Sequence, residues 1–235
     1  MMSYARRAID LFDMIEEGDR VAVGVSGGKD SLALLCAMHG ISRFYPKRFE
    51  VVPINIRMGF PNEDISGSVM LCESLGLELV SVESDIYSVV FEHRKEKSPC
   101  SLCANMRRGA LHDAAKKAGC NKLALGHHYD DVVETAVMNL FLEGRFDCFL
   151  PVTYLSRRDI TVIRPMVFAP EKDIVHFARV NGLATAPKNC PADGNTKREE
   201  TKSALAELEK RDRGVKARLF GAVERGVWAK RLGDS

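Results

Sequence analysis

The sequence lacks a strong charge of either sign and any long apolar run. Its 34 Lys and Arg residues nearly balance 32 Asp and Glu residues, so the formal net charge is only +2. A chain of this composition does not hold nucleic acid by overall charge alone. No stretch approaches the roughly 20 apolar residues of a membrane-spanning helix, and the acidic residues that soon follow Arg6 and Arg7 do not fit a secretory signal. We therefore expect a cytoplasmic protein without membrane association.

Seven cysteines are present, an odd number without a secretory segment. A disulfide framework is therefore not expected, and metal binding or catalysis is the better explanation for cysteines outside the core. Four of them stand among apolar neighbours and are predicted to be small core residues: Cys36, Cys72, Cys120 and Cys148. The others, Cys100, Cys103 and Cys190, stand beside proline, serine, asparagine and charged residues, where packing alone does not explain them.

Short apolar runs alternate with segments of helical periodicity along the first 185 residues. The runs predict strands at residues 20–25, 49–56, 77–82, 122–126 and 161–163. The periodic segments predict helices at residues 4–15, 31–39, 63–75, 104–118, 130–142 and 171–180. Strands separated by helices indicate an α/β fold with a doubly wound, mostly parallel sheet.

The strand pattern ends before residue 196, and two helices are predicted at residues 196–213 and 215–230. Residues 197–235 contain eleven Lys and Arg against seven Asp and Glu, so this end is more basic than the whole chain. We predict two regions. Residues 1–185 form the α/β domain, and residues 186–235 contain the loop with the last cysteine and a short helical C-terminal tail.

A glycine-rich turn, Ser-Gly-Gly-Lys-Asp-Ser, follows the first predicted strand and opens a helix. Glycines let backbone N–H groups turn toward an anion, the helix N-terminus adds partial positive charge and Lys29 adds a full charge. The turn is not a Walker A loop, because Val23 stands where its first glycine is required and Asp30 follows the lysine. The alternative is an accidental tight turn. The predicted phosphate-binding residues are Ser26, Gly27, Gly28, Lys29, Asp30 and Ser31.

A second polar segment, Gly-His-His-Tyr-Asp-Asp at residues 126–131, follows the fourth predicted strand. Ligands of doubly wound sheets bind at the C-terminal ends of the strands, where Gly126 would let a nucleotide approach the backbone. Asp131, in the first turn of the next helix, is placed to hold Mg²⁺ or a proton during the reaction, and Asp30 also suits Mg²⁺. Helix capping is an equally good explanation for three other side chains: His128, Asp130 and Glu134.

A Cys-x-x-Cys pair, Cys100 and Cys103, precedes a predicted helix that also carries Arg107. Helix polarity and nearby positive charge are expected to lower the pKa of such thiols, which favours metal binding. With Cys190 there are three candidate ligands, one short of a closed zinc site and suited to a [4Fe–4S] cluster with one open iron. The alternatives are a redox dithiol, a zinc site completed by a histidine such as His93, and unrelated thiols.

The phosphate-binding turn resembles the PP-loop of the ATP pyrophosphatase family. Four further motifs follow in one order: Cys-Ser-Leu-Cys-x-x-x-Arg-Arg-Gly, Ala-Leu-Gly-His-His-x-Asp-Asp, Ile-Arg-Pro and Glu-Lys-Asp-Ile. Over most of the chain this order is similar to that of the tRNA 2-thiocytidine synthetases. The resemblance implies that residues 1–185 form a PP-loop ATP-binding domain in which Gly126 and His127 also contact the nucleotide. It implies that Cys100, Cys103 and Cys190 hold a [4Fe–4S] cluster.

The same resemblance implies an activity. ATP, accompanied by Mg²⁺, would adenylate the C2 oxygen of a cytidine in the anticodon loop, and sulfide would then displace AMP. Asp131 and Arg107 would act at the reacting centre. The implied partners are tRNA, a sulfur donor such as a cysteine desulfurase, and a second copy of the chain in a homodimer.

RNA binding requires basic residues that neutralise phosphates. The candidates are Arg94, Lys95, Lys97, Arg107, Arg108, Lys116 and Lys117 near the cysteines, and Lys197, Arg198, Lys202, Arg211 and Arg213 in the tail. Acidic residues between them make a solvated helix face an equally good explanation. Two other functions stay open: a PP-loop ligase or amidating enzyme that uses an amine nucleophile, and a zinc-bearing RNA-binding protein without turnover.

Overall fold

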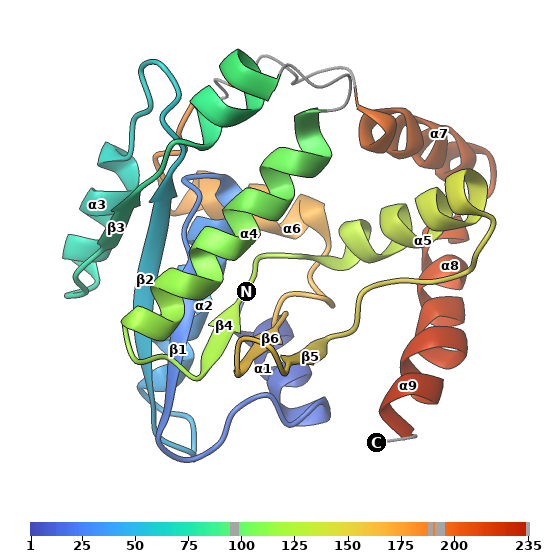
Figure 1. Cartoon of the computed structure of the whole chain (residues 1–235). Helices are drawn as coiled ribbons and strands as arrows, with labels where there is room; N and C mark the ends of the chain where they lie inside the picture. Colours follow the sequence, from blue (N-terminus) through green and yellow to red (C-terminus); the bar gives the residue numbers. More distant parts are fainter. Residues whose placement is uncertain (95–98, 188–189, 191–195, 234–235) are drawn as a thin grey trace.

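Six strands form one sheet in the order β3-β2-β1-β4-β6-β5 (Figure 1). The strands are β1 (Asp19–Gly24), β2 (Phe49–Arg57), β3 (Val80–Glu83), β4 (Lys122–Ala124), β5 (Val152–Leu155) and β6 (Ile160–Ile163). Neighbouring strands are parallel, except that β5 runs antiparallel to β6. The computed structural model describes residues 1–94, 99–187, 190 and 196–233. The predicted doubly wound, mostly parallel sheet is confirmed, and β5 adds an edge strand that the sequence does not predict.

Helices cover both faces of this sheet. They are α1 (Met2–Leu11), α2 (Lys29–Ser42), α3 (Ser66–Ser74), the π-type helix η1 (Ser88–Arg94), α4 (Pro99–Lys117), α5 (Tyr129–Glu143), α6 (Glu171–Val180), α7 (Lys197–Arg211), α8 (Val215–Val223), the π-type helix η2 (Glu224–Trp228) and α9 (Ala229–Gly233). Val21 and Val23 of β1 face the core shared with α1, α2 and α6, whereas Ala22 faces the core under α4 and η1. Figure 1 shows α4 crossing one face, with α2 and α6 behind the sheet. This alternation is that of a strand buried on both faces.

Several element boundaries differ from those predicted: α1 ends at Leu11 and not at residue 15, and α3 begins at Ser66 and not at residue 63. The strand predicted from residue 77 begins at Val80, because Leu77 N still donates to Cys72 O (2.9 Å) in a turn that closes α3. The helix predicted from residue 104 begins at Pro99, since proline suits the first helical position. The Cys-x-x-Cys pair therefore lies in the first two turns of α4 and not before it.

The C-terminal helices α7 and α8 pack against α5 and share the larger core. Trp228 is buried, and its Nε1 donates to Phe149 O at 2.9 Å, so it anchors this packing. The division between residues 185 and 186 stays a prediction, because residues 188–189 and 191–195 lie outside the described part. Within the described residues, none of the helices has both the length and the apolar character needed to cross a bilayer.

Candidate active site

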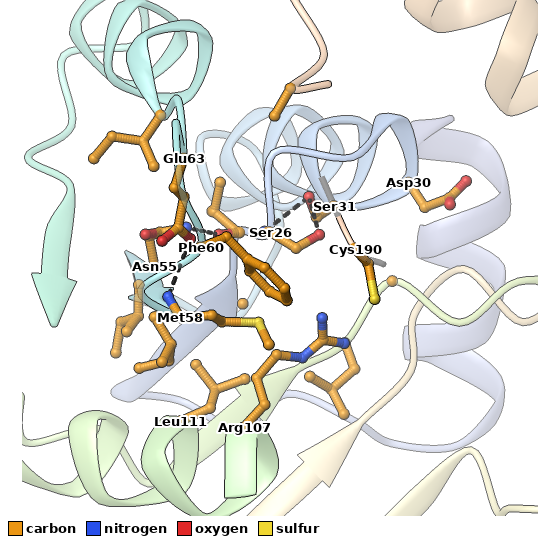
Figure 2. A pocket seen from close by; sticks show the side chains of 18 of the residues that line it. Ser26, Asp30, Ser31, Asn55, Met58, Phe60, Glu63, Arg107, Leu111 and Cys190 are labelled. Atoms are coloured by element: carbon orange, nitrogen blue, oxygen red, sulfur yellow. Dashed lines mark hydrogen bonds between the residues drawn. The ribbon is translucent and has the colours of Figure 1, made fainter. Parts of the chain in front are cut away.

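A cavity of about 370 Å³ opens at the C-terminal ends of β1, β2 and β4 (Figure 2). From β1 the chain continues to β2, toward one edge of the sheet, and from β4 it continues to β5 and β6, toward the other edge. Doubly wound sheets bind ligands at the point where the strand order reverses in this way. The predicted site residues in its wall are Ser26, Asp30, Ser31, Arg107, Gly126, His127 and Cys190. The wall also contains residues to which the sequence analysis gives no role: Met58, Phe60, Glu63, Leu111, Ala186 and Pro187. The phosphate-binding loop and one of the three cysteines thus face the same space.

The phosphate-binding loop between β1 and α2 is held in one conformation by its own hydrogen bonds. Ser31 Oγ donates to Gly28 O (2.9 Å) and accepts from Ser26 N (3.1 Å). Gly27 has a φ of 79°, which favours glycine, and its carbonyl accepts a hydrogen bond from Ala186 N at 3.0 Å. The segment that leads to Cys190 is therefore attached directly to the loop.

Lys29 is partly buried and pairs with two carboxylates. Its Nζ lies 3.0 Å from Asp30 Oδ1 and 3.1 Å from Glu171 Oε1, and Glu171 also pairs with Lys202 of α7 at 2.6 Å. Burial alone would raise the pKa of Glu171, but hydrogen bonds from Lys202 and Lys29 outweigh burial and lower that pKa to about 2. Glu171 is therefore charged at neutral pH and keeps Lys29 at the start of α2, where a phosphate would compete for it.

Two buried polar atoms of the cavity wall, Asn55 Oδ1 and His127 Nδ1, accept or donate no hydrogen bond within the described part of the chain. Buried polar atoms are normally paired, so these atoms indicate a bound partner. Burial and the Arg164 charge lower the pKa of His127 to about 3, which keeps its ring neutral. Together with the unpaired N–H groups at the start of α2, these atoms fit a nucleotide.

Gly126 lies against the backbone of α2, and a side chain there is expected to disturb nucleotide binding. A Cβ would meet the carbonyl carbon and oxygen of Asp30 at 3.2 Å. Because overpacking costs about 1 to 3 kcal/mol, Gly126→Ala should weaken the affinity for a non-hydrolysable ATP analogue roughly ten-fold in calorimetric titration. The matched control is Gly109→Ala in α4, where a Cβ meets nothing within 4 Å. Equal affinities of the two variants would remove Gly126 from the nucleotide site.

Asp131 has structural partners for both carboxylate oxygens. Oδ2 accepts from His128 N (2.9 Å) in the capping box of α5, and Oδ1 pairs with Arg198 of α7 at 2.6 Å. His128 Nε2 lies 3.5 Å from Asp131 and 3.9 Å from Asp30, so this ring stands between the two carboxylates. Helix capping thus explains Asp131 as well as His128, and the catalytic role of Asp131 stays a prediction.

The three candidate cluster ligands lie on two parts of the chain. Cys100 and Cys103 lie in the first two turns of α4, and Cys190 is part of the cavity wall. Burial raises the pKa of the Cys103 thiol, Arg107 lowers it, and the neighbouring Cys190 and Cys100 raise it further. The expectation of a lowered pKa is wrong for Cys103, because burial outweighs Arg107, whose guanidinium is directed toward Cys190 in Figure 2.

Three thiols beside a positive charge fit an iron–sulfur cluster by donor type. In the described ranges, no three His, Cys, Asp or Glu side chains are grouped to hold a single metal ion. A four-iron cluster is larger than one ion, and each of its ligand sulfurs binds a different iron, so its ligands stand further apart. The assignment of Cys100, Cys103 and Cys190 as cluster ligands stays a prediction.

The basic residues considered for RNA binding fall into two groups. In the first group, Arg198 of α7 pairs with Asp131, and Lys202 of α7 pairs with Glu171. Arg107 and Arg108 of α4 are exposed near the cysteines. Two further candidates lie outside the described residues: Lys95 and Lys97.

The chain is similar to known proteins along most of its length. Residues 2–205 match the PP-loop domain. The chain is 40% identical to the tRNA-cytidine(32) 2-sulfurtransferase of Geobacter sulfurreducens, over 92% of this chain and 86% of the relative. It is 37% identical to the protein of the same name from Ralstonia pickettii, over 100% of this chain and 75% of the relative. Among solved structures, the U34-tRNA thiolase NcsA from Methanococcus maripaludis with its [4Fe-4S] cluster superimposes with a TM-score of 0.77 at 25% identity, covering 95% of this chain and 77% of that chain.

Proposed function

The chain belongs to the tRNA-cytidine(32) 2-sulfurtransferase family of PP-loop proteins, and on this basis we propose that it uses ATP to replace the C2 oxygen of a tRNA cytidine with sulfur. The observation that carries the proposal is the shared cavity: the phosphate-binding loop and Cys190 both line it. A sulfur-transfer enzyme needs the activated oxygen and the incoming sulfur at one carbon, and a shared cavity provides that proximity.

The reaction proceeds in two steps, adenylation of the cytidine and displacement of AMP by sulfide. The cytidine oxygen attacks the α-phosphorus of ATP, the bond from that phosphorus to the bridging oxygen breaks, and pyrophosphate leaves. Sulfide then adds to C2, and the original oxygen leaves with AMP. Lys29 and the N–H groups at the start of α2 stabilise the departing pyrophosphate, since pre-placed positive charge lowers the energy of a developing anion.

Two groups that accompany this chemistry are assigned to residues of the chain. Asp30 would hold Mg²⁺ with Asp131 as the second carboxylate, because Mg²⁺ prefers carboxylate and phosphate oxygens. The ion would replace Lys29 as the partner of Asp30 Oδ1 and Arg198 as the partner of Asp131 Oδ1. Cys100, Cys103 and Cys190 would hold the [4Fe–4S] cluster. When bound, the cluster supplies an open iron that can carry the sulfide.

Arg107 is the residue proposed to act on the reacting atoms from the α4 side. It lines the cavity, and its guanidinium is directed toward Cys190 (Figure 2). A guanidinium there would stabilise negative charge on the phosphate or the sulfide. Arg107→Ala is therefore expected to slow 2-thiocytidine formation roughly 100-fold in single-turnover assays while ATP affinity is unchanged.

The matched control for Arg107 is its neighbour Arg108, which lies outside the cavity wall and donates to Asn105 Oδ1 at 3.2 Å. Arg108→Ala should change the rate less than about three-fold, as expected for an exposed charge near RNA. An equal loss in both variants would assign the effect to general attraction of RNA and would contradict a role for Arg107 at the reacting atoms.

The experiment that tests the proposed function is direct detection of the product. Anaerobically purified protein is incubated with ATP, Mg²⁺, sulfide and unmodified tRNA, and the digested nucleosides are analysed by mass spectrometry. We expect 2-thiocytidine, with one AMP and one pyrophosphate formed per modified residue. Consumption of ATP without a thionucleoside, or thiolation without AMP, would overturn the proposal.

The remaining partners follow from the proposal. A tRNA is the substrate, a sulfur donor such as a cysteine desulfurase supplies the sulfide, and the protein works in the cytoplasm, where its tRNA and ATP are found. The homodimer is proposed from the family resemblance, and light scattering of the purified protein tests it.

A further inference from the structure

Phe60 is an aromatic side chain in the wall of the cavity that neither the nucleotide site nor the cysteines use. It follows β2 by three residues, at the edge of the sheet where the cavity opens. In Figure 2 its ring extends from the β2 side into the cavity, on the side where Arg107 of α4 and Cys190 are drawn. An aromatic ring at this position is available to stack on a flat ligand.

The loop that carries Phe60 is held in place by backbone hydrogen bonds. The Glu63 carboxylate accepts from Met58 N and Gly59 N, both at 3.1 Å, and Glu63 N donates to Phe60 O at 3.2 Å. On the other side of the loop, Tyr87 N donates to Met58 O at 2.8 Å. Phe60 therefore sits on a turn that hydrogen bonds of the chain itself close.

Two further rings support Phe60 from behind. Its centroid lies 5.1 Å from that of Tyr87 and 5.9 Å from that of Phe91, and Tyr87 and Phe91 stack on each other at 5.5 Å. Such contacts stabilise ring orientation beyond the area that they bury. The three rings form an aromatic platform, with Phe60 as the member that lines the cavity.

We propose that Phe60 stacks on the target cytosine and positions it for both steps of the reaction. This inference rests on the proposed function. The reacting C2 must lie between the α-phosphate, bound on the phosphate-loop side, and the sulfur delivered near Cys190, and the Phe60 ring extends into the space between these sides. Proteins that act on one base of a folded RNA read it after it leaves the stack, and aromatic side chains commonly receive it. Phe60 is thus a positioning residue for the substrate base; a role at the adenine of ATP would instead lower the ATP affinity of a Phe60 variant.

A binding cycle tests the inference. An anticodon stem-loop RNA with cytidine at the target position is compared with the same RNA abasic there, for the parent protein and for Phe60→Leu. Stacking on one base contributes about 1 to 3 kcal/mol, so the parent should bind the abasic RNA roughly ten-fold more weakly. Phe60→Leu should bind both RNAs with equal, weaker affinity, Phe60→Tyr should restore the preference, and ATP affinity should stay unchanged in each variant.

The control variant is Phe141→Leu, an aromatic that is 78% exposed and outside the cavity wall, which should keep the preference. The inference is overturned if Phe60→Leu still prefers the intact base, if the parent shows no preference, or if the variant loses ATP affinity instead. The binding cycle measures RNA affinity and not product formation, so its outcome is independent of the test of the proposed function. A protein that prefers the intact base but forms no 2-thiocytidine would support the role of Phe60 and contradict the proposed reaction.

Discussion

Lys29→Ala is expected to lower the rate of pyrophosphate release roughly 100- to 1,000-fold, the usual effect of removing one group that stabilises a reacting anion. Lys29 opens α2, and its Nζ lies 3.1 Å from Glu171, at the place where the terminal phosphates of ATP would bind. The loss should appear in the tRNA-dependent formation of AMP and pyrophosphate.

The fold and the cysteines should not depend on Lys29. Glu171 keeps Lys202 as a partner at 2.6 Å when Lys29 is removed, and the Ser26 and Ser31 hydrogen bonds do not involve the lysine. Iron content and melting temperature should therefore match the parent protein. Lys47→Ala, which removes an exposed ion pair with Asp13, is the control and should leave the rate unchanged. Retained ATP consumption in Lys29→Ala would refute the assigned role.

Cys190→Ala is expected to abolish thiolation by removing the iron–sulfur cluster, while ATP binding is retained. A cluster that loses one of three protein ligands is not held stably, so the iron content should fall to background. The nucleotide loop should be intact, since Ala186 N is attached to Gly27 O by a backbone hydrogen bond that the substitution does not touch. Iron analysis and calorimetric titration of an ATP analogue, both under anaerobic conditions, measure the two effects separately.

The matched control is Cys120→Ala. Cys120 is 2% exposed in the core beneath α4 and is not part of the cavity wall. Its removal should lower stability modestly, since a small buried side chain is truncated, and should leave the iron content unchanged. Iron that stays bound in Cys190→Ala would remove this residue from the ligand set.

The nucleotide half of the site could be predicted from the sequence because it is local. The strand, the turn and the helix that make the phosphate-binding loop are contiguous in residues 20–39, and their glycine, lysine and serine positions determine the geometry directly. The α/β class follows in the same way from buried strands alternating with helices. The edge strand β5 is four residues long, with three half-buried residues and an exposed Tyr154, so its pattern is too short to stand out.

The remaining wall of the cavity is formed by tertiary contacts that sequence spacing does not reveal. Phe60 lines the cavity because of the turn that the Glu63 carboxylate closes. A single phenylalanine after a predicted strand does not indicate such a position in the sequence. Arg198 is one of several basic residues in a charged helix, where RNA binding is a reasonable hypothesis. The packing of α7 on α5 instead brings it 2.6 Å from Asp131.

The central claim is that three cysteines hold an open iron–sulfur cluster beside the ATP cavity. Iron, acid-labile sulfide and zinc analysis of anaerobically purified protein tests it most directly. The account predicts about four irons and four sulfides per chain and little zinc. Zinc alone would favour an RNA-binding module, neither metal would favour an enzyme that uses an amine nucleophile, and either result would contradict the claim.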